Sequence, residues 1–148
     1  MHFPSPKELK TALSLDADAR AFITESRETA RHIISGSDRR LAILVGPCSI
    51  HEIEGSLIYA EKLKTLAERV KESCFLVMRV CVEKPRTGKG WKGLLYDPHL
   101  DGSDEIERGL KQSRALFLEL ARRKVPIVTE FVDPLVSYYF DDLVVWGV

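Results

Sequence analysis

A chain of 148 residues, 45% of them apolar and 30% charged, is long enough to bury one hydrophobic core of ordinary size. Its 22 lysines and arginines balance its 22 aspartates and glutamates, so no overall charge attracts it to nucleic acid or to an anionic membrane. No apolar run approaches the roughly 20 residues that span a bilayer, and the start has no secretory pattern, which together predict a cytoplasmic protein.

The first part of the chain is predicted to be a helical extension followed by a buried strand. Residues 6–34 are polar and compatible with a helix that ends at Gly36-Ser37-Asp38, so we interpret residues 1–40 as an N-terminal helical extension. An uninterrupted apolar run follows at 41–45 and closes at Gly46-Pro47. Such a run is typical of a strand that is buried on both faces, and strands of this kind belong to parallel sheets.

The rest of the chain alternates between helical and strand-like spacing of apolar residues. This spacing predicts helices at 57–70 and 105–121, strands at 75–82 and 125–132, and a short amphipathic helix at 135–146. Strict alternation of strand and helix indicates right-handed βαβ units and a parallel sheet. Residues 41–148 are therefore predicted to hold three βα units of an α/β fold.

A long segment at 83–103 has neither spacing and is rich in glycine, proline, lysine and aspartate. Ordered domains rarely contain a structureless loop longer than roughly 12 to 15 residues unless the loop has a function. Its glycines at 88–93 invite comparison with a nucleotide P-loop, but the Gly-Lys-Ser/Thr ending of that motif is missing. We therefore predict a functional loop that is not a P-loop.

Reactive side chains follow each predicted strand. Ligands collect at the carboxyl ends of the strands in parallel α/β folds. The first strand leads into Cys48, the second contains Arg79 and leads into Lys84 and Arg86, and the third contains Glu130 near its end. A thiol, several cations and a carboxylate are therefore predicted to meet at one edge of the sheet.

Arg79 interrupts an apolar strand, where a guanidinium is costly to bury unless an anion pairs with it. A bound phosphorylated anion would satisfy it, and the cations Lys84 and Arg86 just beyond the strand suit phosphate. The alternatives are a structural ion pair of Arg79 with Glu83 or Glu130, and a basic loop that is merely solvated.

Three cysteines form an odd set without a CxxC pair, which argues against a disulfide framework and a structural zinc site. The thiol of Cys48 follows a Gly-Pro turn and is a candidate metal ligand or nucleophile, with a packed thiol as the alternative. Cys74 and Cys81 adjoin an apolar strand and are predicted to be buried. His51 and His99 lack a recognised ligand spacing and are interpreted as hydrogen-bonding residues.

Several strings in the right order resemble one enzyme family, the class I 3-deoxy-D-arabino-heptulosonate 7-phosphate synthases. They lie at 45–51 (VGPCSIH), 77–80 (VMRV), 83–87 (EKPRT), 90–93 (GWKG), 97–102 (DPHLDG), 129–131 (TEF) and 146–147 (WG). The resemblance runs from about residue 41 to the last residue and more loosely over the N-terminal helix.

The resemblance implies a (β/α)8 TIM barrel, of which this chain holds an N-terminal helical extension and about the first three βα units. It implies condensation of phosphoenolpyruvate with D-erythrose 4-phosphate to 3-deoxy-D-arabino-heptulosonate 7-phosphate, the first step of the shikimate pathway to chorismate and the aromatic amino acids. It also implies a divalent metal ion, which is manganese, iron, cobalt or zinc. The complete enzyme is expected to be a cytoplasmic homo-oligomer without nucleic-acid or membrane partners.

The resemblance assigns roles to single residues by their place in the motifs. Cys48 is expected to be one metal ligand, and Arg79 to bind phosphoenolpyruvate. Lys84 and Glu130 are expected to have both catalytic and substrate-binding roles. Lys84 would reach the substrates, and Glu130 would lie near the reacting carbons. The erythrose phosphate is expected to be surrounded by Pro85, Arg86 and Thr87.

Other readings remain open beside this one. Three of eight barrel strands would leave open sheet edges and one metal ligand, so residues 1–148 alone are expected to be inactive and to associate. A non-catalytic phosphate-binding α/β module or a regulatory subunit is the alternative function. A small doubly wound nucleotide-binding domain is disfavoured, because no glycine-rich turn follows the first strand.

Overall fold

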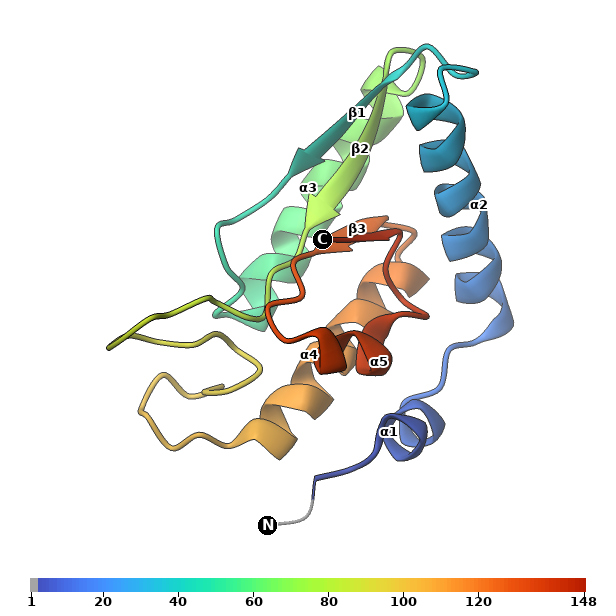
Figure 1. Cartoon of the computed structure of the whole chain (residues 1–148). Helices are drawn as coiled ribbons and strands as arrows, with labels where there is room; N and C mark the ends of the chain where they lie inside the picture. The colour runs from blue at the N-terminus through green and yellow to red at the C-terminus, as the bar shows by residue number, and fades with distance from the viewer. Residues whose placement is uncertain (1–2) are drawn as a thin grey trace.

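Four parallel strands form the sheet, and they lie side by side in the order of the chain (Figure 1). The computed structural model describes residues 3–148. The strands are β1 (Leu41–Val45), β2 (Cys74–Arg79), β3 (Ile127–Thr129) and β4 (Trp146–Gly147). The prediction of a parallel α/β fold is thus confirmed. A doubly wound sheet reverses its strand order, whereas the order here follows the chain, as it does in a β/α barrel.

Two helices connect the first three strands. α3 (Ile53–Val70) joins β1 to β2, and α4 (Ile106–Arg122) joins β2 to β3. Figure 1 shows α3 behind β1 and β2, and a long loop that leaves the carboxyl end of β2 before α4 begins. The core of the fold lies between the sheet and these helices, and the side chains of Met78, Phe117 and Leu120 are fully buried in it.

The N-terminal extension is helical, as predicted, but it consists of two helices with a break that the sequence analysis did not predict. They are α1 (Pro6–Ala12) and α2 (Ala17–Ile34), and α2 packs against α4. The break occurs because Asp16 caps a new helix by accepting a hydrogen bond from the backbone N–H of Ala19 at 2.9 Å. No helix in the described residues is long and apolar enough to cross a membrane.

β1 is an edge strand, and the prediction that both of its faces are buried was wrong. Leu41, Ile43 and Leu44 are exposed, because β1 pairs with β2 on one side only among residues 3–148. An apolar run indicates that a strand is suited to burial. It does not indicate which other elements cover the strand. This edge presents unpaired backbone groups beside apolar side chains.

The last segment differs from the predicted amphipathic helix over 135–146. A 3₁₀ turn (Pro134–Val136) and the short helix α5 (Ser137–Phe140) lead into β4, which pairs with β3. The chain therefore contains a fourth strand beyond the three that were predicted. Two residues are too few to show an alternating pattern, so the sequence gives no signal for β4.

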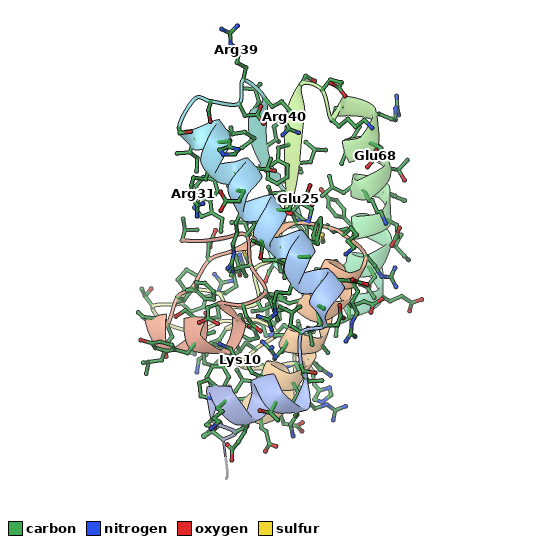
Figure 2. All side chains as sticks on the ribbon, turned by 90° about the vertical axis from the view of Figure 1, so that its right-hand side faces the viewer. Lys10, Glu25, Arg31, Arg39, Arg40 and Glu68 are labelled. Carbon is green, nitrogen blue, oxygen red and sulfur yellow. The ribbon has the colours of Figure 1, made fainter. Side chains whose placement is uncertain are left out.

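A buried arginine joins the N-terminal helices to the end of the chain. The side chain of Arg114 on α4 is fully buried and donates to the carbonyl oxygens of Leu13 at 2.9 Å and Tyr139 at 2.7 Å. It also donates to both carboxylate oxygens of Asp142, at 2.9 and 2.8 Å. Lys10 on α1 pairs with Asp141 nearby, and Figure 2 shows Lys10 on the side of α1 that faces this segment.

Candidate anion-binding site at the carboxyl ends of the strands

Two cations meet at the backbone carbonyl of Cys48. Arg79 donates to this oxygen from Nη2 at 3.0 Å, and the Lys84 ammonium donates to the same oxygen. The Lys84 Nζ also lies 3.4 Å from the Cys48 Sγ, and Cys48 is exposed. Cys48, Arg79 and Lys84, which the sequence predicts to meet at one edge, therefore lie together at the carboxyl ends of β1 and β2.

The pairing of β1 with β2 brings these residues together. The parallel register sets Val45 opposite Met78, so the residues that follow each strand are neighbours. The backbone N–H of Ile50 then donates to the carbonyl oxygen of Cys81 at 2.9 Å, and the Ser49 hydroxyl donates to the same oxygen at 3.3 Å. These bonds fix the loop that carries Cys48 against the end of β2.

Arg79 has donor capacity that the described residues do not use. Its Nε is buried and has no hydrogen-bond partner among residues 3–148. The pKa of Arg79 is raised first by the Cys81 sulfur and then, more weakly, by the carboxylate of Glu130. A thiol is only a weak acceptor, so the guanidinium still lacks a strong partner. An anion at this edge of the sheet would supply one.

The structural ion pair with Glu83 that the sequence left open is not formed, because Glu83 is engaged elsewhere. Its side chain is fully buried and accepts hydrogen bonds from the Tyr96 hydroxyl at 3.1 Å and from the backbone N–H groups of Val132 and Asp133 at 3.2 and 3.4 Å. Burial raises the pKa of Glu83, and these hydrogen bonds oppose that rise. Sequence reasoning missed this arrangement.

Glu130 lies directly after β3 and is half-buried. Its carboxylate acts on Arg79 through a longer-range attraction that helps to raise the pKa of Arg79, and not through an ion pair. The second open alternative, a structural pair between Arg79 and Glu130, is therefore also not formed. Glu130 is thus close enough to Arg79 to attract it electrostatically without forming an ion pair with it.

The long loop after β2 holds three of the predicted site residues at exposed positions. Pro85, Arg86 and Thr87 are exposed, and the Arg86 Nε donates to the Trp91 carbonyl oxygen at 3.1 Å. The loop returns to its own beginning, since the N–H of Lys84 donates to the Lys92 carbonyl oxygen at 2.8 Å. The Arg86 side chain is thus held within the loop by its hydrogen bond to Trp91.

Metal-ligating side chains are sparse in this structure. Residues 3–148 contain no group of three or more histidine, cysteine, aspartate or glutamate side chains that could hold a metal ion. His51 is exposed, and the His99 Nε2 lies 3.5 Å from the Glu105 carboxylate. Cys48 is exposed, and Cys81 is buried as expected, whereas Cys74 is only half-buried. Cys48 is therefore the exposed thiol at this edge of the sheet.

Comparison with known proteins identifies a family for nearly the whole chain. The profile of the DAHP synthetase I family matches residues 14–148. The Tyr-sensitive phospho-2-dehydro-3-deoxyheptonate aldolase of Escherichia coli K12 is 48% identical over 143 residues, which are 97% of this chain and 40% of that protein. The phospho-2-dehydro-3-deoxyheptonate aldolase of Amycolatopsis methanolica is 41% identical over 97% of this chain and 70% of its own length.

A solved structure agrees with these sequences. The phospho-2-dehydro-3-deoxyheptonate aldolase of Francisella tularensis SCHU S4 superimposes with a TM-score of 0.95 and 37% identity, covering 99% of this chain and 43% of the other. The chain therefore spans about two fifths of the length of the Escherichia coli and Francisella relatives. The fold is that of the corresponding part of this relative.

Proposed function

This chain belongs to the DAHP synthetase I family, and we propose that it supplies the phosphoenolpyruvate-binding edge of an enzyme that condenses phosphoenolpyruvate with D-erythrose 4-phosphate. The product is 3-deoxy-D-arabino-heptulosonate 7-phosphate, which enters the shikimate pathway to the aromatic amino acids. The relatives carry the corresponding aldolase name, and the chain spans about two fifths of the Escherichia coli protein. The complete enzyme would be cytoplasmic and homo-oligomeric.

One observation carries this proposal. Arg79 is partly buried at a strand end with its Nε unpartnered, and Lys84 is directed at the same carbonyl group. Two cations side by side repel each other, and an anion between them removes that repulsion. Phosphoenolpyruvate, with a phosphate and a carboxylate, offers acceptors to a guanidinium and an ammonium at once.

The other site residues take the roles that their positions allow. Lys84 would bind substrate and stabilise charge during the condensation, and Glu130 would act close to the reacting carbons. The exposed Pro85, Arg86 and Thr87 would surround the second phosphorylated substrate, because they lie on the loop that begins at Lys84. Fixed cations offset the mutual repulsion of two phosphorylated anions, which is the electrostatic difficulty of this reaction.

Cys48 is proposed as one ligand of a divalent metal ion. Its thiol is exposed at the site, which suits coordination of manganese, iron, cobalt or zinc by a thiolate. One thiol does not make a catalytic metal site, which ordinarily has three or more protein ligands, so the residues described do not hold the metal alone. No step of the reaction is therefore assigned to the metal.

A second function is favoured by the same scarcity of metal ligands among residues 3–148. The chain by itself would be a phosphate-binding α/β module or a regulatory subunit that binds phosphoenolpyruvate without turning it over. Extending the chain to the length of its relatives and assaying condensation with added manganese separates the two functions. Residues 1–148 alone are expected to show no turnover.

Binding of phosphoenolpyruvate to residues 1–148, measured by isothermal titration calorimetry, tests the site itself. Arg79→Ala is expected to weaken binding by about tenfold or more, because it removes a charge-assisted hydrogen-bond donor. The control is Arg39→Ala, at the opposite end of the sheet in the turn before β1, where Figure 2 shows the side chain projecting into solvent. Equal affinity of the Arg79 and Arg39 variants, or no binding by the wild-type chain, would contradict the proposal.

A further inference from the structure

Glu83 and Lys84 are adjacent in the sequence, but their side chains lie in different surroundings. Lys84 reaches outward to Cys48, whereas the side chain of Glu83 is fully buried. An isolated buried carboxylate is costly, so its hydrogen-bond partners explain what it does. Two of the three partners of Glu83 lie beyond the next strand, in the loop after β3, and the third, Tyr96, lies 13 residues further along the same loop as Glu83.

The partners of Glu83 come from two loops. Tyr96 lies at the returning end of the loop after β2, and its hydroxyl donates to the Glu83 Oε1. Val132 and Asp133 lie in the loop after β3, two and three residues beyond Glu130, and their N–H groups donate to Oε2 and Oε1. One carboxylate therefore ties the exit of β2 to the exit of β3.

Backbone packing keeps Glu83 fixed relative to the returning loop. Gly93 has φ +110°, and a Cβ at this position would lie 2.3 Å from the Val82 carbonyl oxygen and 2.8 Å from the Glu83 Cα. Only glycine allows the loop to approach so closely. The N–H of Leu95 also donates to the Val82 carbonyl oxygen at 3.0 Å. Glu83 thus sits at a closely packed junction between the start and the returning end of this loop.

We propose that Glu83 is a positioning residue, whose carboxylate holds the loops after β2 and β3 together and thereby directs the Lys84 ammonium to Cys48. This inference rests on the proposed function in one respect, namely that Lys84 binds phosphoenolpyruvate. Glu83 has no contact with substrate in this role. It acts through the neighbouring residue, as partners that orient a binding side chain commonly do.

A double-mutant cycle with Glu83→Ala, Lys84→Ala and the double variant tests whether Glu83 acts through Lys84. Phosphoenolpyruvate binding to residues 1–148 is expected to weaken by about tenfold in Glu83→Ala and to change little when Lys84 is already alanine. Glu25→Ala is the matched control, since this glutamate is exposed on α2 (Figure 2), a helix that carries none of the predicted site residues. Additive effects of the two substitutions would overturn the positioning role.

If the wild-type chain binds no phosphoenolpyruvate, a measurement without ligand tests whether Glu83 positions Lys84. Nuclear Overhauser contacts between Lys84 and Cys48 are expected in the wild-type chain and in Glu25→Ala, and to be lost in folded Glu83→Ala. Their retention would overturn the inference, whereas absent binding by the wild-type chain would count against the proposed function alone.

Glu83→Gln serves as the milder variant if Glu83→Ala does not fold. The amide oxygen keeps two of the three acceptor contacts, and its NH₂ group opposes one N–H donor. Faster amide exchange is then expected at Val132, because its partner oxygen is replaced by the NH₂ group. The affinity for phosphoenolpyruvate is expected to lie between those of wild type and Glu83→Ala. Unchanged exchange at both Val132 and Asp133 in Glu83→Gln would contradict the proposed tie.

Discussion

Gly46 lies so close to Arg79 that a Cβ at position 46 would come within 2.5 Å of the Arg79 carbonyl oxygen and 3.1 Å of the Arg79 Cβ. The glycine at the end of β1 therefore allows the loop that carries Cys48 to pass directly over β2. Any larger residue must push the end of β1 away from Arg79.

Gly46→Ala is expected to lower the free energy of unfolding by about 1–3 kcal/mol, as overpacking of a filled site does. It should also weaken phosphoenolpyruvate binding, because Arg79 is displaced. Urea denaturation measures the first effect and calorimetric titration the second. Gly88→Ala is the control, since a Cβ there meets nothing within 4 Å and its φ is ordinary. Equal stability of the two variants would show that β1 and β2 can separate at no cost.

Arg114→Met is expected to lower the free energy of unfolding by about 3–5 kcal/mol, because it leaves the half-buried carboxylate of Asp142 and two carbonyl groups without their donor. Thermal or urea unfolding measures the loss. Lys71→Met removes an exposed pair with Glu68 and is expected to cost less than about 1 kcal/mol. A comparable small effect for both variants would mean that the buried contacts of Arg114 contribute little to folding.

The contribution of Glu83 to stability is expected to decrease as the pH rises. Burial raises the folded-state pKa of Glu83 above its ordinary value of 4.5, and the charge of Asp133 adds to the rise. The pKa of Tyr96 is raised to about 12, so its hydroxyl stays protonated. The folded chain then binds the Glu83 proton more tightly than the unfolded chain does, which stabilises the fold below pH 4.5 and is lost as the pH rises through the folded-state pKa.

Glu83→Gln cannot titrate and therefore lacks this dependence. The free energy of unfolding of wild type minus that of Glu83→Gln should fall as the pH rises above 4.5, the ordinary pKa of a glutamate. Urea unfolding at a series of pH values measures the difference. A difference that rises over this range would mean that the hydrogen bonds to Glu83 outweigh its burial and that its folded-state pKa is lowered.

Leu44→Lys is expected to reduce self-association of residues 1–148. Leu44 is 44% exposed on the edge strand β1, where it lies beside open backbone groups, and a lysine on an edge strand discourages pairing with another chain. Sedimentation velocity over a range of concentrations measures the effect. Ile58→Lys, at an exposed position on α3, controls for the added charge. Equal association of both variants would show that the β1 edge is not the contact.

The sequence predicts most of the site because parallel strands bring their carboxyl ends to one edge. Cys48, Arg79 and Lys84 could be expected together once three strands and their order were recognised. The engagement of Glu83 could not, since it depends on backbone N–H groups about 50 residues away and on a tyrosine hydroxyl. A sequence pattern contains no information about which buried carboxylate a distant loop will approach.

The differences in the fold have a similar origin. Burial on both faces of β1 was inferred from its own composition, but burial depends on neighbours that pattern alone does not supply. The break before α2 did carry a local signal, because Asp16 is a favourable N-cap residue. β4 is held by its pairing with β3 and by Gly147, where a Cβ would lie 2.5 Å from the ring of Phe131. Such a contact appears only in three dimensions.

The buried guanidinium of Arg114 imposes an order on the folding of the nascent chain. One of its acceptors, Leu13, precedes it by 101 residues, and another, Asp142, follows it by 28. At roughly 5–20 residues per second, ribosomal synthesis exposes Asp142 about one to six seconds after Arg114. During that interval α4 carries a positive charge that its final packing would bury without a counterion. The N-terminal helices are thus made first, but they can settle onto α4 only after the segment that contains Asp142 has emerged.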